Sequence, residues 1–247
     1  MQKGTIPSRM ELVSFVLAAY EERDSLPTLL DEIRSAAERG GLSYEIVVVD
    51  DGSSDGSAAW LKEQAAEHGD VVPILFPVNR GQSAGMAVAL RAARGSRLVT
   101  MDSDLQNDPA DSLALLEALD AEQADLATGV RVNRRDSWGK RVGSRLGNAV
   151  RRWQLKDEFR DVGCQIRAWR RPVVDAIPMF RGFHRYIPVL ARDAGFRVVE
   201  RDVNHRHRQH GYSKYGNLGR ALAGLRDLRG VRWLQSRAID TRVENDA

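Results

Sequence analysis

Short apolar runs alternate with amphipathic segments through the first half of the chain. Leu12–Ala18 and Glu45–Val49 are apolar runs of strand length, and Pro27–Arg39 between them places its leucines and alanines on one helical face. The same alternation predicts strands at Val71–Phe76, Leu98–Met101 and Leu126–Val130, and helices at Ser57–Glu67, Ser83–Arg94 and Pro109–Leu119. Short strands that alternate with longer helices are typical of a mainly parallel sheet flanked by helices. We therefore expect an α/β fold.

Polar clusters follow the first four predicted strands. They read "AYEE", "DDGSSDGS", "PVNRGQ" and "DSD", in chain order. The carboxyl ends of parallel strands meet at one edge of a sheet, and ligands of open α/β sheets bind beyond that edge. Four such clusters on one rim predict a binding site.

The second cluster is suited to a nucleoside. Asp50 and Asp51 can accept hydrogen bonds from a base or a ribose, and Gly52 lets the backbone approach a ligand closely. The alternative is an Asp-Gly turn followed by a helix cap at Asp55 or Ser57.

The third cluster opens a predicted helix and is suited to an anion. In Asn79–Ser83 ("NRGQS"), the glycine, the backbone amides and Arg80 suit an anionic ligand. The stretch lacks the fuller P-loop pattern, which argues against a nucleoside-triphosphate hydrolase. A plain junction between a loop and a helix is the alternative.

The fourth cluster, Asp102-Ser103-Asp104, can place carboxylate oxygens around one hard divalent cation. Mg²⁺ and Mn²⁺ favour such ligands and can share them with a diphosphate. The alternative is a capped loop in which Asp108, before Pro109, starts the next helix. The position at a strand end, with a nucleoside-like cluster on the same rim, favours the metal.

Composition and charge add a contrast between the two halves of this 247-residue chain. Residues 1–130 hold 10 Lys and Arg against 22 Asp and Glu, whereas residues 131–247 hold 27 against 12. This predicts cationic partners for the first half and anionic partners for the second. Solvated arginine-rich helices are the alternative for the second half. Nucleic-acid binding is disfavoured, because it leaves the acidic half and the strand-end clusters without a role.

The cysteine content and the apolar pattern bear on disulfides and on membrane contact. The one cysteine, Cys164, excludes an intramolecular disulfide and a multi-cysteine metal site, and a buried structural thiol is the expected role. No secretory signal or membrane span is expected from the apolar pattern. Asn217–Arg237 predicts a basic amphipathic helix that can lie on an anionic membrane surface. Packing of that helix on the domain or on a second subunit is the alternative, so a homo-oligomer stays open.

The order and spacing of these motifs resemble glycosyltransferase family 2, which has the Rossmann-like GT-A fold. The resemblance covers roughly residues 11–216 and rests on "VSFVLAAYEE", "EIVVVDDGSSDGS", "NRGQSAGMAVALRAA" and "VTMDSDLQNDPAD". The second half is similar to the polyprenyl-phosphate glycosyltransferases, the group of dolichyl-phosphate mannose synthases and undecaprenyl-phosphate sugar transferases. The stretches that carry this likeness are "TGVRVNRRDSWGKRVGSRLGN", "DVGCQIRAWRR" and "HRYIPVLARDAGFRVVERDVNHRHRQHGYSKYG".

The resemblance implies roles for particular residues. With the clusters above, the nucleotide-sugar site comprises Ala19, Tyr20, Glu22, Asp50, Asp51, Arg80, Gln82, Asp102, Ser103 and Asp104. Asp102 and Asp104 are the implied metal ligands and, with Arg131 and Arg135, the implied catalytic residues. The acceptor phosphate is assigned to Arg131, Arg135, Lys140, Arg141 and Ser144. A basic loop that closes over the diphosphate is assigned to His207, Arg208, Ser213 and Lys214.

The resemblance also implies an activity and a domain plan. We expect inverting, metal-dependent transfer of a sugar from a UDP- or GDP-linked donor to a polyprenyl phosphate, for cell-envelope glycan or glycolipid synthesis. The location implied is cytoplasmic, peripheral at the inner face of the membrane. The expected plan is a GT-A domain at 1–216, with a nucleotide-sugar half (1–130) and an acceptor half (131–216), and a helical tail at 217–247. Transfer to a saccharide or glycolipid hydroxyl, or nucleotide-sugar binding without catalysis, are the alternatives.

Overall fold

The computed structural model describes residues 11–132, 138–206 and 217–237. The chain divides into two compact units, residues 1–135 with 160–212 and residues 136–159 with 213–247. The predicted boundaries after residues 130 and 216 stay predictions. Within the described ranges, no helix is both long and apolar enough to cross a membrane.

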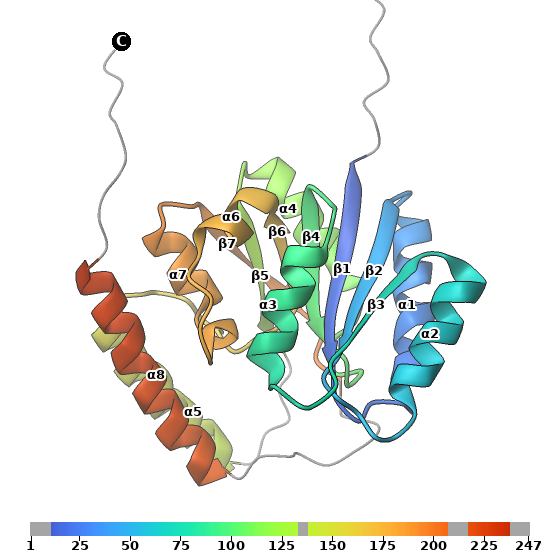
Figure 1. Cartoon of the computed structure of the whole chain (residues 1–247). Helices are drawn as coiled ribbons and strands as arrows, with labels where there is room; N and C mark the ends of the chain where they lie inside the picture. Colours follow the sequence, from blue (N-terminus) through green and yellow to red (C-terminus); the bar gives the residue numbers. More distant parts are fainter. Residues whose placement is uncertain (1–10, 133–137, 207–216, 238–247) are drawn as a thin grey trace, which may run out of the picture. The chain divides into compact units, whose positions relative to one another are not determined.

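The first unit is built on a seven-stranded sheet with the strand order β3-β2-β1-β4-β6-β5-β7 (Figure 1). The strands are β1 Leu12–Ala19, β2 Ser43–Asp50, β3 Val71–Leu75, β4 Arg97–Asp102, β5 Leu126–Arg131, β6 Arg167–Arg170 and β7 Val198–Val203. All pairings are parallel except the two made by β6, which runs antiparallel between β4 and β5. The prediction of a mainly parallel sheet flanked by helices is therefore confirmed.

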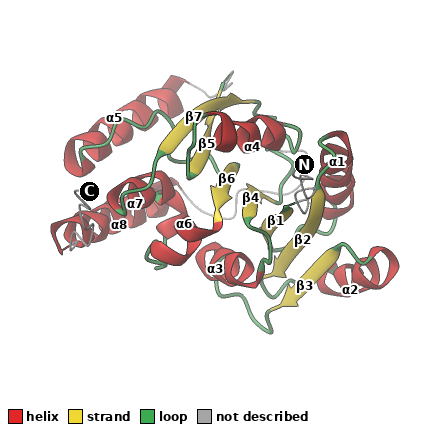
Figure 2. Cartoon of the chain, turned by 90° about the horizontal axis from the view of Figure 1, so that it is seen from above, coloured by secondary structure: helices red, strands yellow, loops and turns green. Residues whose placement is uncertain are grey.

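Helices cover both faces of this sheet, as Figure 2 shows. They are α1 Leu26–Arg39, α2 Ser57–His68, α3 Gln82–Ala92, α4 Asp111–Ala121, α6 Arg171–Ala176 and α7 Ile187–Asp193, with a short 3-10 helix at Phe183–Arg185. One buried cluster joins Leu29, Leu61 and Leu115, so α1, α2 and α4 pack on one face of the sheet. Helices α3, α6 and α7 lie on the other face. Burial of apolar side chains on both faces explains why the central strands are nearly continuous apolar runs.

The five strands predicted from the apolar pattern are all present, whereas β6 and β7 were not predicted. The four residues of β6 read "RAWR", and charged residues interrupt the apolar run. The predicted start of a helix at Pro109 is wrong by two residues. Asp108 instead closes a turn, accepting a hydrogen bond from the Ala110 amide at 3.0 Å through Oδ1, and α4 begins at Asp111.

The second unit contains helices α5 (Trp138–Leu155) and α8 (Asn217–Arg237), which lie side by side (Figures 1 and 2). Arg232 donates to the carbonyl oxygen of Gln154, and the Gln235 amide donates to that of Leu155 at 3.2 Å. Leu228 and Val231 are buried. The helix predicted at Asn217–Arg237 is thus confirmed, and part of its apolar face is covered. Its contact with a membrane stays a prediction.

Candidate active site

The carboxyl ends of four neighbouring parallel strands form one rim. Ala19 at the end of β1 pairs with Asp50 at the end of β2, and Ala18 pairs with Asp102 at the end of β4. β3 ends beside them, with Leu75 paired to Asp50. The four polar clusters therefore share one edge of the sheet, as the sequence predicted.

Both carboxylate oxygens of Asp51 accept hydrogen bonds from the loop after β3. Its Oδ1 accepts a hydrogen bond from the backbone amide of Arg80 at 2.6 Å, and its Oδ2 accepts one from that of Gly81 at 2.8 Å. The next residue, Gly52, has φ +73°, and a Cβ there would lie 2.5 Å from the Val78 carbonyl carbon. A side chain at this position would clash with backbone, so the "DDG" stretch holds the loop after β3 in place.

Asp50 has a buried oxygen that is suited to a ligand. The residue is 1% exposed, and its Oδ2 accepts a hydrogen bond from the Ser53 amide at 3.1 Å. In the part of the chain that the structure describes, no donor reaches Oδ1. Buried polar atoms without a partner are rare in proteins. An N–H group of a bound ligand would satisfy this oxygen.

The loop after β1 contributes the aromatic ring of Tyr20 to the rim and is hydrogen-bonded to the loop after β2. Tyr20 is 36% exposed, and Ala19 is buried. Glu22, which was assigned to the nucleotide, accepts a hydrogen bond from the Ser25 hydroxyl at 3.1 Å beside the start of α1. Glu21 was not predicted as a site residue, and its Oε1 accepts hydrogen bonds from the Ser54 amide and hydroxyl at 2.7 and 3.0 Å. Its place in the "AYEE" stretch was the one signal in the sequence.

The "DSD" stretch lies between the loops after β1 and β3. Gln82, at the first turn of α3, donates to Asp102 Oδ1 at 2.9 Å. Ser103 donates to the carbonyl oxygen of Ala18 at 3.2 Å, and Asp104 Oδ1 accepts a hydrogen bond from the Gln106 amide at 3.1 Å. Leu105 has φ +61°. This left-handed conformation costs about 1–2 kcal/mol for a residue with a side chain, so neighbouring contacts must hold it.

These residues fit a cation only if a ligand completes its coordination. Among the described residues there is no group of three or more His, Cys, Asp or Glu side chains that could hold a metal ion. Asp102 and Asp104 offer two hard carboxylates beside Gln82, which fits a cation that takes its other ligands from a diphosphate and water.

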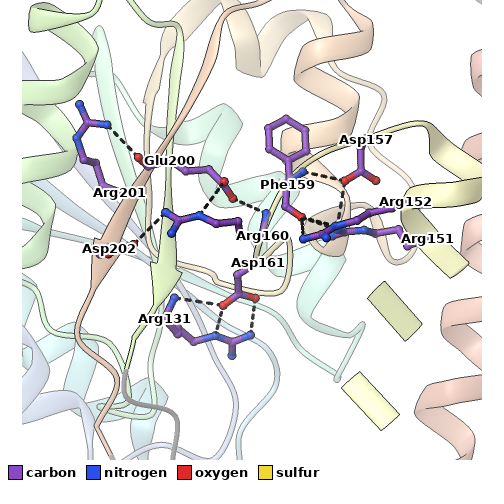
Figure 3. A network of polar contacts seen from close by, with 10 residues as sticks. All are labelled: Arg131, Arg151, Arg152, Asp157, Phe159, Arg160, Asp161, Glu200, Arg201 and Asp202. Atoms are coloured by element: carbon purple, nitrogen blue, oxygen red, sulfur yellow. Dashed lines mark hydrogen bonds and ion pairs between the residues drawn. The ribbon is translucent and has the colours of Figure 1, made fainter. Parts of the chain in front are cut away.

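Arg131 is held by Asp161, the carboxylate of the "DVGC" stretch, which was not predicted as a site residue. Asp161 accepts hydrogen bonds from Arg131 Nε at 2.7 Å, from Nη2 at 2.8 Å and from the backbone amide at 3.3 Å (Figure 3). A Cβ on Gly163 would lie 3.1 Å from Arg131 Nη2, so glycine leaves room for the guanidinium. The pair thus joins two motifs, "TGVR" and "DVGC", that are about 30 residues apart in the sequence.

The segment around Asp161 is also fastened to β7. Arg160 donates through Nη2 to Asp202 at 2.9 Å, and Glu200 accepts from the Arg160 backbone amide at 2.8 Å (Figure 3).

The pKa of Arg131 lies above its ordinary value. Burial lowers it, but the hydrogen bond and charge of Asp161 raise it, with smaller contributions from Cys164 and Asp102. Arg131 is therefore a fixed positive charge near Asp102.

A buried polar layer lies behind Arg131. Arg167 is fully buried and donates to the carbonyl oxygen of Val162 at 2.8 Å, and burial lowers its pKa to about 10. Cys164 is also buried, and burial raises the pKa of its thiol to about 11 although Arg131 and Arg167 lower it. A thiol with this pKa is neutral at pH 7, and the prediction that Cys164 is buried is confirmed.

Ser83 connects the first turn of α3 to a buried histidine. Its hydroxyl oxygen accepts a hydrogen bond from the Gly182 amide at 2.8 Å and lies 3.0 Å from His184 Nδ1. We assign the hydroxyl proton to the bond with Nδ1, since the Gly182 amide already donates to the oxygen. Burial, with the charges of Arg185 and Arg167, lowers the pKa of His184 to about 3. His184 is therefore neutral at physiological pH.

We expect replacement of His184 by Gln to weaken the acid sensitivity of the fold. In the unfolded chain His184 takes up a proton below its ordinary pKa of about 6.5, whereas the folded protein does not until about pH 3. The free energy of unfolding therefore falls as the pH falls, by about 2 kcal/mol between pH 7 and pH 5 from this residue. Urea unfolding at both pH values measures the loss. An equal loss in His184→Gln would contradict the assignment.

Some predicted residues cannot be compared with the structure. Arg135, His207, Arg208, Ser213 and Lys214 lie outside the described residues. Lys140, Arg141 and Ser144 lie on α5, where the backbone is described and these side chains are not. Their assignments to the acceptor phosphate and the diphosphate stay predictions.

Comparison with solved structures agrees with the fold. Glucosyl-3-phosphoglycerate synthase from Mycobacterium tuberculosis, in a complex with Mn²⁺, UDP and glucosyl-3-phosphoglycerate, gives a TM-score of 0.65 at 19% identity, over 98% of this chain and 88% of that one. Mannosyl-3-phosphoglycerate synthase from Rubrobacter xylanophilus gives 0.67 at 19% identity, over 96% and 78%. At this identity the likeness concerns the fold, and it supports the GT-A prediction.

Curated relatives are more similar in sequence. The undecaprenyl-phosphate 4-deoxy-4-formamido-L-arabinose transferase of Aeromonas hydrophila is 36% identical over 84% of this chain and 64% of its own length. The protein of the same name from Pseudomonas fluorescens is 39% identical over 90% and 65%. The chain thus spans just under two thirds of these relatives. Residues 14–187, which carry the whole rim and the Arg131–Asp161 pair, match the family model described as Glycosyl transferase family 2. The chain therefore belongs to glycosyltransferase family 2.

Proposed function

We propose that this protein transfers a sugar from a nucleotide-diphosphate sugar to a polyprenyl phosphate. One observation carries the donor half of the proposal. The Asp102 carboxylate, which accepts a hydrogen bond from Gln82, lies on the same rim as Asp50, whose Oδ1 has no hydrogen-bond partner among the described residues. Asp50 and Tyr20 bind the nucleoside, and the first turn of α3 faces the diphosphate. Amide groups at a helix N-terminus are suited to phosphate oxygens.

Family membership and the names of the relatives support the acceptor half. The relatives from Aeromonas hydrophila and Pseudomonas fluorescens are named as transferases that act on undecaprenyl phosphate. Arg131 binds the acceptor phosphate in this proposal, since an arginine fork pairs well with phosphate oxygens. Asp161 holds the guanidinium through Nε and Nη2, which fixes its direction before the acceptor arrives.

The reaction needs little proton transfer from the protein. A phosphate monoester has a second pKa of roughly 6, so the acceptor oxygen is largely ionised at neutral pH and no strong general base is needed. A divalent cation, Mg²⁺ or Mn²⁺, held by Asp102 and Asp104 would neutralise charge on the departing diphosphate. Gln82 orients Asp102, and Arg131 brings the acceptor oxygen to the anomeric carbon. A single displacement of this kind inverts the configuration of the sugar.

Contact with a membrane surface follows from the acceptor. In the second unit, Trp153 on α5 is 78% exposed and Trp233 on α8 is 61% exposed, and Arg229 and Arg232 are exposed on α8. Tryptophan beside arginine is typical of helices that lie at the surface of an anionic bilayer. We propose that this unit binds the cytoplasmic membrane surface peripherally, where polyprenyl phosphate is embedded.

A direct assay tests the proposal. The purified protein is incubated with a panel of UDP- and GDP-linked sugars, with and without Mn²⁺ or Mg²⁺, and with either a polyprenyl phosphate in vesicles or a set of saccharides. We expect a metal-dependent lipid-linked sugar. Transfer to saccharides alone would instead support an enzyme that acts on a hydroxyl group. Donor binding without any transfer would support a nucleotide-sugar-binding protein.

Membrane contact has a separate readout. We expect wild-type protein to sediment with vesicles that contain anionic lipid, and the double variant Trp153→Ala, Trp233→Ala to sediment several-fold less. Equal sedimentation of the two proteins would exclude these tryptophans from the contact.

A further inference from the structure

The end of β7 is tied to two other segments of the first unit by one arginine. Arg206 Nη1 donates to both carboxylate oxygens of Glu32 on α1, at 2.8 and 2.7 Å, and Nη2 lies 2.8 Å from Asp108 Oδ2. The Arg206 backbone amide donates to the carbonyl oxygen of Gln106 at 2.9 Å. Arg206 thus contacts α1 and the loop after β4 at the same time.

The two residues before Arg206 contact the same loop. Asn204 donates to Asp111 through its backbone amide at 2.7 Å and through Nδ2 at 3.1 Å. His205 forms an antiparallel bridge with Asn107. Three consecutive residues after β7 therefore contact the stretch from 106 to 111, and the Asp111 side chain binds the first of them, Asn204.

This stretch also supports the two carboxylates of the proposed metal site. Asn107 Oδ1 accepts a hydrogen bond from the Asp102 amide at 3.1 Å, and Asp104 accepts one from the Gln106 amide. Leu105 lies between them with φ +61°. A side chain at positive φ persists only where surrounding structure holds it, and the contacts of Arg206 begin at the next residue.

We propose that Arg206 is a positioning residue that clamps the loop from 104 to 108, so that Asp102 and Asp104 keep the spacing a cation and a diphosphate need. The proposal rests on the proposed function, because it concerns the geometry of the same donor site. Arg206 and Glu32 are each about one third exposed, at 32% and 31% of the side chain, so their ion pair contributes little to global stability. Its effect on the loop is direct, because Arg206 contacts the Gln106 carbonyl oxygen and the Asp108 carboxylate.

The test combines hydrogen exchange with metal binding. In the ligand-free full-length protein, we expect Arg206→Met to raise the exchange rate of amides in the loop from 104 to 108 by at least tenfold. Isothermal titration of Mn²⁺ into protein saturated with UDP, or with GDP if only GDP binds, measures the cation affinity. Loss of a group that supports metal ligands typically weakens binding about 10–100-fold, and we expect about tenfold for Arg206→Met. Glu32→Gln should give a smaller loss of the same kind.

Arg34→Met is the matched control. Arg34 is on the same helix as Glu32 and pairs with Asp70 at 2.9 Å, and Asp70 directly precedes β3, at the opposite edge of the sheet. The Arg34→Met variant should lower the melting temperature at least as much as Arg206→Met, without changing amide exchange in the loop from 104 to 108 or the Mn²⁺ affinity.

Two outcomes would overturn the clamp: unchanged amide exchange in Arg206→Met, or a Mn²⁺ affinity of that variant within twofold of wild type. If wild-type protein binds neither nucleotide with Mn²⁺, the proposed donor site fails and the positioning role fails with it, while the exchange data still show whether Arg206 holds the loop.

Discussion

Replacement of Asp102 or Asp104 by Asn is expected to lower the rate of sugar transfer about 10³-fold, because the charge that holds a cation on the diphosphate is removed. Such a loss corresponds to about 4 kcal/mol of transition-state stabilisation. The amide oxygen of Asn can still accept the hydrogen bonds from Gln82 and from the Gln106 amide. We therefore expect the variants to fold, with melting temperatures close to wild type, and the rate of lipid-linked product formation measures the effect.

Asp70→Asn provides a control for the loss of a carboxylate. Asp70 accepts hydrogen bonds from Arg34. Burial raises the pKa of the Asp70 carboxyl, but the hydrogen bond and charge of Arg34 hold it below its ordinary value. This variant should lose stability and keep transfer activity. Near-normal turnover in Asp102→Asn or Asp104→Asn would refute the role of these carboxylates in metal binding.

Replacement of Asp161 by Asn is expected to lower kcat/KM for the acceptor about 10²-fold and to leave nucleotide binding unchanged. The Asp161 carboxylate binds Arg131 Nε and Nη2, and the side chains are only 11% and 20% exposed. Loss of the charge leaves the guanidinium poorly oriented, and we expect a stability loss of about 2 kcal/mol, since a partly buried charge then lacks its partner. Arg131→Lys tests the same contact, because it keeps the charge and loses the fork.

Arg160→Met is the control for this pair. It removes ion pairs to Glu200 and Asp202 one residue from Asp161, and Arg160 is 54% exposed. Exposed pairs contribute little, so stability should change by less than about 1 kcal/mol, with a normal acceptor KM. Titration calorimetry measures donor binding, and initial rates at varied polyprenyl phosphate measure acceptor use. Equal losses for donor and acceptor in Asp161→Asn would remove Arg131 from the acceptor site.

Much of the donor rim could be predicted from the sequence. Asp50 and Asp102 each end an apolar run, and an apolar run of that length between helices marks a parallel strand. β6 was not predictable in the same way, because Arg167 interrupts its apolar pattern and the strand forms by pairing with β4 and β5. Tertiary pairing overrode the local pattern there.

The supporting contacts of the site were not predictable. Arg131 and Asp161 are 30 positions apart, and Arg206 and Glu32 are 174 apart. Neither separation has a periodicity that a single sequence can reveal. Arg131 was assigned to the acceptor from its motif, but the carboxylate that orients it emerged only from the fold. Asp51 was assigned to the nucleotide, and that role stays a prediction, while its oxygens accept hydrogen bonds from the backbone of the loop after β3.

The sequence by itself determined the family, the alternation of strands and helices, and the rim on which Asp50 and Asp102 lie, because local apolar patterns and motif order carry this information. Only the tertiary structure decided which carboxylates accept hydrogen bonds from distant parts of the chain. Asp50 has an oxygen without a donor among the described residues, while Asp51, Asp111 and Asp161 bind groups distant in the sequence. The physical reason is that an Asp in a sequence does not reveal its hydrogen-bond partners, because these depend on the donors that folding brings within about 3 Å of the carboxylate.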